Sequence, residues 1–216
     1  MFSPFFNLWK MSKENGVVVA FGLIWIAIKM SFFLTGNSEQ GFFAGGMANI
    51  LFILLICFWA LKLKYDSLVT IAQENGTENG VQRKLLPEDS NFLDDVKTSM
   101  KAAGKYILII AASVFIYYSV IDSEYSSRII DQRVQLAKEQ TATEESWQKV
   151  LENAPTLSEI SKEEYIQHVR EDAEVWTSPG RQTSITLFGL FLLAIFYSLL
   201  LVVTFRKLLY RKPGRQ

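Results

Sequence analysis

Four long apolar runs constrain the fold of this 216-residue chain more than any other feature of its sequence. They cover residues 17–35, 42–61, 106–120 and 185–205. A helix rises 1.5 Å per residue, so about 20 apolar residues cover the roughly 30 Å of hydrocarbon in a bilayer. The third run is short, but the small residues at 102–104 lengthen it toward the N-terminus. The chain is therefore expected to be an all-α, polytopic membrane protein with four transmembrane helices.

The distribution of lysine and arginine predicts which ends of these helices face the cytoplasm. Fourteen basic residues precede the first run, separate the second from the third, or follow the fourth, and none separates the first from the second. The stretch between the third and fourth runs has seven basic residues and thirteen acidic ones. Since basic residues gather on the cytoplasmic side, we expect both termini inside and the acidic stretch outside. The expected location is the inner membrane of a bacterium, in multi-pass form.

Polar stretches and turn signals divide the chain around the runs. The expected parts are an interfacial N-terminal segment (1–16), a transmembrane hairpin of spans one and two (17–62), a cytoplasmic loop with an amphipathic helix (63–104), span three (105–121), an acidic periplasmic helical insert (122–182), span four (183–205) and a basic cytoplasmic tail (206–216). Within the loop, Asn75–Gly80 reads as a turn-rich linker. Ser90 is expected to cap the helix that follows, with Asp94 and Asp95 in its early turns.

The four apolar runs contain a single charged residue, Lys29. Two interpretations stay open. The long stem of Lys29 can carry the ammonium toward the outer headgroups, or the ammonium can lie buried beside Asn49 of the second run, at a comparable depth. The second interpretation makes Lys29 and Asn49 a candidate intramembrane polar site.

The second run begins with small residues at helical spacing. Gly41 and Gly45 form one pair and Ala44 and Ala48 a second, which predicts a helix-packing site where another helix approaches closely. The short connection 36–40 favours an antiparallel hairpin with the first run. A different subunit is the alternative neighbour.

The acidic insert is expected to contain three amphipathic helices. One continues from span three over 122–140, a second starts after the cap Thr143, and a third starts at the capping box that begins with Ser161. Their larger apolar side chains define a candidate partner-docking face: Trp147, Leu151, Tyr165, Val169 and Trp176. Three helices in about sixty residues bury little surface, so they are expected to pack on a partner, on the membrane, or on one another as a cap.

The residues that usually carry chemistry are scarce. Cys57 is the sole cysteine and His168 the sole histidine, which excludes an intramolecular disulfide and a pair of histidines for haem. Glu164, His168 and Asp172 share one side of a predicted helix but lack further ligands, so no metal and no cofactor are predicted. The apolar runs hold no Asp or Glu, which argues against a proton pump. Zero net charge gives no reason to expect a nucleic-acid partner.

The order of these features resembles a known family. The run Lys-Thr-Ser-Met-Lys-Ala-Ala-Gly at 97–104 leads into span three, the insert follows Ile121 and Asp122, and Ser178 precedes a Ser-rich span four. Isolated landmarks within this order are Gly104, Asp122, Pro179 and Ser198. Over nearly its whole length the chain resembles the bacterial family called domain of unknown function 4199. The resemblance implies a four-span inner-membrane protein and supplies no catalytic residues.

Three function classes follow from these observations. Visible interaction surfaces without reactive groups favour a non-enzymatic accessory or scaffold subunit, whose partners are membrane lipids and a membrane or periplasmic protein, or a second copy. A small carrier or channel would use the polar site of Lys29 and Asn49. An enzyme acting on a lipid-linked substrate, with outer carboxylates such as Glu164 and Asp172, ranks last.

Overall fold

The computed structural model of the chain describes residues 13–77 and 91–209. Within these ranges the chain is helical and has no strand, which confirms the all-α prediction. The elements in order are α1 (Lys13–Leu34), α2 (Ser38–Thr77), α3 (Phe92–Ile116), the π-helical turn η3 (Tyr117–Ile121), α4 (Tyr125–Gln140), α5 (Glu144–Asn153), the 3-10 turn η4 (Pro155–Glu159), α6 (Lys162–Thr177), α7 (Pro179–Thr204) and the π-helical turn η5 (Phe205–Leu209). The predicted linker Asn75–Gly80 is wrong at its start, because α2 continues to Thr77. Outside the described residues lie most of the expected interfacial N-terminal segment, residues 78–80 of the linker, Ser90 and the tail beyond 209.

Within the part of the chain that the structure describes, four helical segments are long and apolar enough to cross a membrane, as predicted. They are Lys13–Leu34, Ser38–Ser67, Phe92–Ile121 and Pro179–Lys207. The third differs from the expectation of a separate interfacial helix leading into a span. Nothing interrupts the helix between Phe92 and Ile116, so the lysine-rich amphipathic segment and the third span form one rod.

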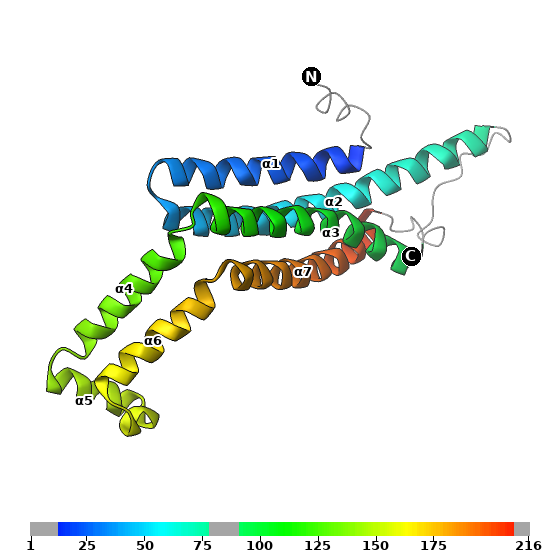
Figure 1. Cartoon of the computed structure of the whole chain (residues 1–216). Helices are drawn as coiled ribbons and strands as arrows, with labels where there is room; N and C mark the ends of the chain where they lie inside the picture. Colours follow the sequence, from blue (N-terminus) through cyan, green and yellow to red (C-terminus); the bar gives the residue numbers. More distant parts are fainter. Residues whose placement is uncertain (1–12, 78–90, 210–216) are drawn as a thin grey trace, which may run out of the picture. The chain divides into compact units, whose positions relative to one another are not determined.

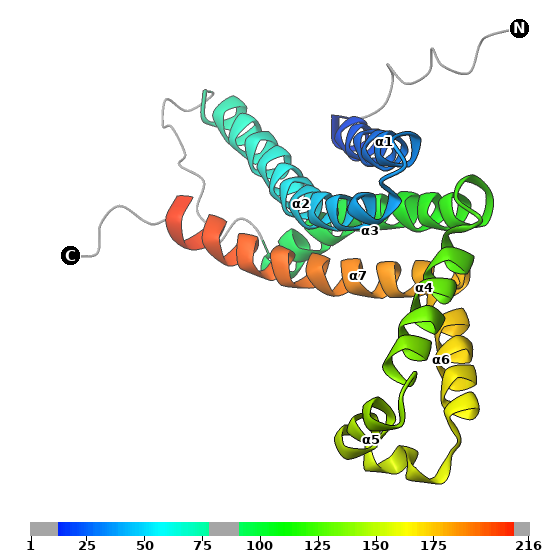
Figure 2. The same cartoon turned by 90° about the vertical axis from the view of Figure 1, so that its left-hand side faces the viewer.

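The chain divides into two compact units, residues 1–110 with 187–216 and residues 111–186. In the first unit, α1 and α2 lie side by side as an antiparallel hairpin (Figures 1 and 2). Gly36 ends α1 with a φ of 73°, a left-handed conformation that glycine adopts without strain. The N–H of Gly36 donates to the carbonyl of Phe33 and that of Asn37 to the carbonyl of Phe32. This Schellman motif closes the turn, and α2 starts at Ser38, sooner than the predicted connection 36–40 allows.

A small apolar cluster joins α2 to the end of α7 in the same unit. Leu61 and Tyr65 of α2 are buried with Val202 of α7 and Phe205 of η5. The rings of Tyr65 and Phe205 stack with centroids 5.7 Å apart. The cluster lies next to the polar network described below, because Tyr65 belongs to both.

The second unit is a helical hairpin in which α4 and α6 lie along each other, with α5 and η4 in the connection between them (Figure 2). The Ser126 hydroxyl donates to the Thr177 carbonyl at 2.7 Å. Thr143 caps α5 and Ser161 caps α6, as predicted. The capping box predicted at Ser161 forms with Glu164, and Thr143 forms a second one with Ser146 that was not predicted. The first predicted helix, 122–140, is wrong at its start. Asp122 has ψ 56°, outside the helical region, and α4 begins at Tyr125.

Candidate functional site

The structure places the predicted polar pair, Lys29 and Asn49, inside the α1–α2–α3 packing. Lys29 is 3% exposed and Asn49 is 5% exposed. The stem of Lys29 lies over Gly45, where an added Cβ would be 3.1 Å from its Cδ. Gly45 precedes Asn49 by one helical turn, so the stem of Lys29, which belongs to α1, lies against the face of α2 that also carries Asn49. Lys29 is thus enclosed by the protein rather than extended to a surface.

Asn49 also contacts α3. The hydroxyl of Tyr106 donates to its amide oxygen at 2.6 Å, and the Tyr106 side chain is fully buried. On the neighbouring turn of α2, the indole N–H of Trp25 donates to the carbonyl oxygen of Gly45 at 3.0 Å. Polar groups of three helices are therefore bonded to one another at this depth.

The predicted small-residue site is used by α1 of the same chain. A Cβ at Gly41 would lie 2.7 Å from the Cβ of Phe32, closer than real contacts allow. Gly41 and Gly45 are buried, whereas Ala44 and Ala48 are half-buried. The glycine pair therefore permits the close approach of the α1–α2 hairpin.

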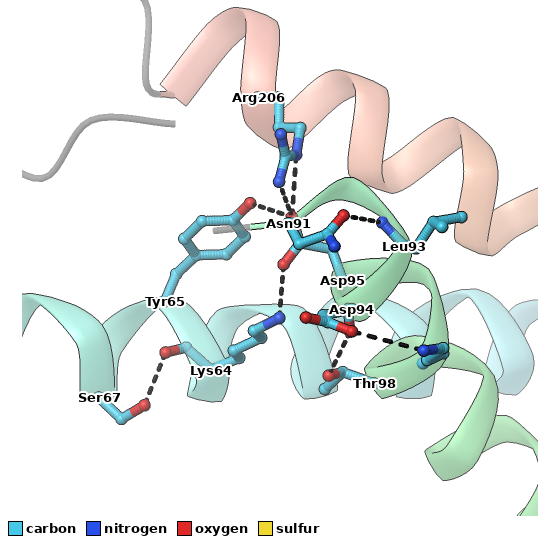
Figure 3. A network of polar contacts seen from close by, with 10 residues as sticks. Lys64, Tyr65, Ser67, Asn91, Leu93, Asp94, Asp95, Thr98 and Arg206 are labelled. Carbon is cyan, nitrogen blue, oxygen red and sulfur yellow. Dashed lines mark hydrogen bonds and ion pairs between the residues drawn. The ribbon is translucent and has the colours of Figure 1, made fainter. Parts of the chain in front are cut away.

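A network centred on Asp95 is the main polar cluster that sequence reasoning missed (Figure 3). The Asp95 carboxylate is fully buried, and Lys64 and Tyr65 each reach one of its oxygens at 2.7 Å, Lys64 at Oδ1 and Tyr65 at Oδ2. Arg206 approaches Oδ2 with Nε at 2.9 Å and Nη2 at 2.8 Å. We call Lys64, Tyr65, Asp95 and Arg206 the Asp95 hub. It ties together α2, α3 and η5.

Local structure explains why these side chains meet. The Asn91 side-chain oxygen accepts from the N–H of Leu93, and its carbonyl accepts from the N–H of Asp95, which fixes the first turn of α3. Lys64 and Tyr65 are consecutive on α2, so the hub takes two donors from one turn. Arg206 lies in the π-helical turn η5, a rare geometry that recurs at functional sites.

A second buried polar contact lies one helical turn along α3 from Asp95. The Ser198 hydroxyl of α7 donates to the Ser99 hydroxyl at 2.9 Å, and the Cys57 sulfur lies 3.7 Å from the Ser198 oxygen. All three side chains are fully buried. The buried side chains between α2, α3 and α7 thus include two hydroxyl groups and a thiol as well as the charged Asp95 hub.

The hub is suited to holding helices rather than to proton transfer. A carboxylate is acceptor-only when ionised, and here both oxygens already receive donors from Lys64, Tyr65 and Arg206. A general base needs an oxygen within reach of a substrate proton. A buried carboxylate with two cationic partners instead makes the separation of its helices costly, because each separation leaves a charge without its partner.

The structure divides the predicted partner-docking face of the insert. Trp147 is buried and packs on Tyr165 with ring centroids 5.6 Å apart, and Leu151 and Val169 are half-buried. Trp176 is 47% exposed, with the Arg181 guanidinium 4.6 Å from its ring centroid. Trp147 and Tyr165 join α5 to α6, and Trp176 remains on the surface beside exposed Val175.

Two glutamates of the insert have lowered pKa values, both for structural reasons. The pKa of Glu144 is lowered by a hydrogen bond from the Lys162 ammonium, 2.7 Å away, and by its charge. The pKa of Glu164 is lowered by hydrogen bonds from Ser161 at the start of α6. Glu164 is thus a helix-capping residue, and His168 beside it is exposed. Among the residues the structure describes, no group of three or more His, Cys, Asp or Glu side chains could hold a metal ion.

The turn between η3 and α4 holds another buried carboxylate. Asp122 Oδ1 accepts from Arg128 Nη2 at 2.8 Å, and the carboxylate is buried. The rings of Tyr117 and Tyr118 are 5.0 Å apart, and those of Tyr118 and Tyr125 are 4.8 Å apart. The helix breaks at Asp122, where ψ is 56° and the carboxylate pairs with Arg128, and the three tyrosine rings pack around this break.

No protein-family model, curated protein or solved structure matches the chain. The resemblance to domain of unknown function 4199 stays a prediction.

Proposed function

We propose that the protein is a non-enzymatic accessory or scaffold subunit of a bacterial inner membrane that docks a larger protein of the cell envelope. One observation carries the proposal. The insert is packed on itself through Trp147 and Tyr165, yet Val175 and Trp176 of α6 stay exposed. An exposed tryptophan on a helix is the kind of anchor that protein interfaces use.

Site-specific photocrosslinking tests this proposal in native membranes. A benzophenone side chain at position 176 is expected to crosslink a protein partner in a discrete adduct. The matched control is the same side chain at Gln148, which is exposed on α5 and lies outside the proposed face. Adducts to lipid alone, or equal protein adducts from positions 148 and 176, contradict the proposal. An adduct between two copies of the chain supports self-association in place of a larger partner.

A small carrier or channel is the second candidate, and the burial of Lys29 and Asn49 favours it. It ranks below the scaffold because Asn49 already accepts a hydrogen bond from Tyr106. If the polar pair conducts a solute, Lys29→Met abolishes the flux in proteoliposomes, whereas Lys207→Met, which alters an exposed lysine of η5, leaves it unchanged. A flux equal to that of the wild type in Lys29→Met removes this candidate.

A further inference from the structure

The Asp95 hub carries more positive than negative charge. Two cations, Lys64 and Arg206, share the single carboxylate of Asp95. The same imbalance extends along the helices. Described residues within two helical turns of a hub residue include six basic ones, Lys62, Lys64, Lys97, Lys101, Arg206 and Lys207, and three acidic ones, Asp66, Asp94 and Asp95. The end of the bundle that holds the hub is therefore electropositive.

The two cations are partly accessible although their carboxylate is not. The side chains of Lys64 and Arg206 are 21% and 20% exposed, and that of Asp95 is 0% exposed. Asp95 and Tyr65 contact the cluster from its buried side, the Arg206 guanidinium lies 5.7 Å from the ring centroid of Phe92, and about a fifth of the Lys64 and Arg206 side chains is exposed. An anion that reaches the exposed part of these side chains meets two cations already held in position.

The position along the membrane helices matches the depth of lipid headgroups. Lys64 follows the last residue of the second apolar run, Leu61, by three residues, which is about 5 Å of helix. Arg206 follows Phe205, the last residue of the fourth run. Lys62 lies 5.4 Å from the ring centroid of Trp59, and such pairs of tryptophan and lysine are typical of the membrane interface.

We propose that Lys64 and Arg206, positioned by Asp95 and Tyr65, form a binding site for the phosphate of an anionic phospholipid headgroup. Arginine and lysine are the side chains that bind phosphate most strongly, through charge-assisted hydrogen bonds. Held side chains lose less conformational freedom on binding than lysines extended into solvent. The site is independent of the partner-docking face, since its residues belong to α2, α3 and η5 and not to the insert.

The test compares lipids on the purified full-length chain in neutral detergent. Phosphatidylglycerol and phosphatidylcholine with the same acyl chains are titrated separately, and retained lipid is measured by native mass spectrometry. The wild type is expected to retain phosphatidylglycerol preferentially. Equal retention of the two lipids by the wild type overturns the proposal.

Lys64→Gln is the informative variant because Asp95 keeps Arg206 and Tyr65, so the buried carboxylate stays paired. We expect an about fivefold fall in the preference for phosphatidylglycerol, the contribution of one basic residue at an anionic lipid surface. Lys207→Gln removes the same charge one residue beyond Arg206, at an exposed position outside the hub, and is expected to keep most of the preference. Equal losses in the two variants overturn the proposal, because they indicate a diffuse surface charge.

Two further measurements separate this result from misfolding and from free phosphate. The melting temperature in lipid-free detergent checks that Lys64→Gln folds; if it does not, Lys64→Arg replaces it and is expected to retain the preference. Inorganic phosphate is then added as a competitor. Displacement of phosphatidylglycerol by inorganic phosphate at an equal concentration assigns the site to a soluble anion and overturns the lipid assignment.

Discussion

Tyr106 of α3 donates a 2.6 Å hydrogen bond to the amide oxygen of Asn49 of α2, and both side chains are buried. The two residues are 57 positions apart in the sequence, so the bond joins two separate helices. Hydrogen bonds between membrane helices contribute about 0.6 kcal/mol on average. We expect Tyr106→Phe to cost about that amount, and the Asn49→Leu and Tyr106→Phe double variant to cost less than the sum of the single changes. A double-mutant cycle on unfolding in detergent measures this coupling, and strict additivity contradicts it.

Gly41 and Gly46 form a matched pair for testing the hairpin. A Cβ at Gly41 would be 2.7 Å from the Cβ of Phe32, and one at Gly46 would meet nothing within 4 Å. Phe32 Cβ is fixed to the backbone and cannot move aside cheaply. Relative to Gly46→Ala, Gly41→Ala is expected to destabilise the protein by about 1–3 kcal/mol, the usual cost of overpacking. Thermal unfolding in detergent reads the difference, and equal melting temperatures refute it.

Asp95 and Asp94 differ in burial but are adjacent in sequence, which gives a second matched pair. Asp95→Asn removes the anion between Lys64 and Arg206, whereas the Asp94 side chain is 57% exposed and faces Lys97 at 3.6 Å. We expect Asp95→Asn to cost about 3 kcal/mol, the low end for a broken buried pair, because its partners are partly solvated. Asp94→Asn is expected to change stability by less than about 0.5 kcal/mol. The free energy of unfolding in detergent is the measurement. Similar losses of stability from both substitutions would contradict the stabilising role of the Asp95 hub.

The first turn of α6 is expected to loosen in acid. Hydrogen bonds from Ser161 lower the pKa of Glu164, so the folded state favours the charged carboxylate. That stabilisation is complete above the ordinary glutamate pKa of about 4.3 and is lost as pH falls through the lower folded value. Hydrogen exchange of the amides at 161–165, corrected for the intrinsic pH dependence, is the measurement, since the Glu164 carboxylate accepts from the N–H of Ser161. Glu164→Gln should remove the acid-induced rise in exchange, and a rise that persists in this variant assigns the effect elsewhere.

Membrane orientation can be tested with single cysteines because the native Cys57 is fully buried. The excess of basic residues at the other polar segments predicts that the insert faces the periplasm. A cysteine at exposed Gln148 of α5 is then expected to react with an impermeant maleimide in intact cells, and a cysteine at Lys207 only after permeabilisation. The reverse pattern contradicts the predicted orientation.

The membrane helices and the caps of the insert are predictable from sequence because their signals are local. Apolar length marks a span, and the patterns at Thr143 and Ser161 satisfy the first amides of α5 and α6. The small pair at Gly41 and Gly45 likewise predicts close packing. The pattern does not predict which helix packs against these two glycines. The structure shows that it is α1 of the same chain.

The sequence predicts that Asp95 interacts with the helix dipole, because Asp95 lies in the first turn of α3. Between Phe92 and Tyr106, the buried residues of α3 are Asp95, Ser99, Ala102, Ala103 and Tyr106, whereas the larger apolar Phe92 is exposed and Val96 and Met100 are half-buried. Small and polar residues dominate this buried set, so a hydrophobicity pattern overlooks it. The partners Lys64 and Arg206 are 31 and 111 residues away and carry no local signal.

The unbroken course of α3 links contacts that are otherwise separate. Asp95, Ser99 and Tyr106 stand on one rod, and the first and last are about 16 Å apart along its axis at the rise of an α-helix. Because the helix is continuous, we expect a displacement of α3 at Asp95 to strain the hydrogen bond between Tyr106 and Asn49 as well. We therefore expect the contacts of Asp95, Ser99 and Tyr106 to open as one cooperative unit. The backbone amides of α3 next to these three residues should then share one hydrogen-exchange protection factor.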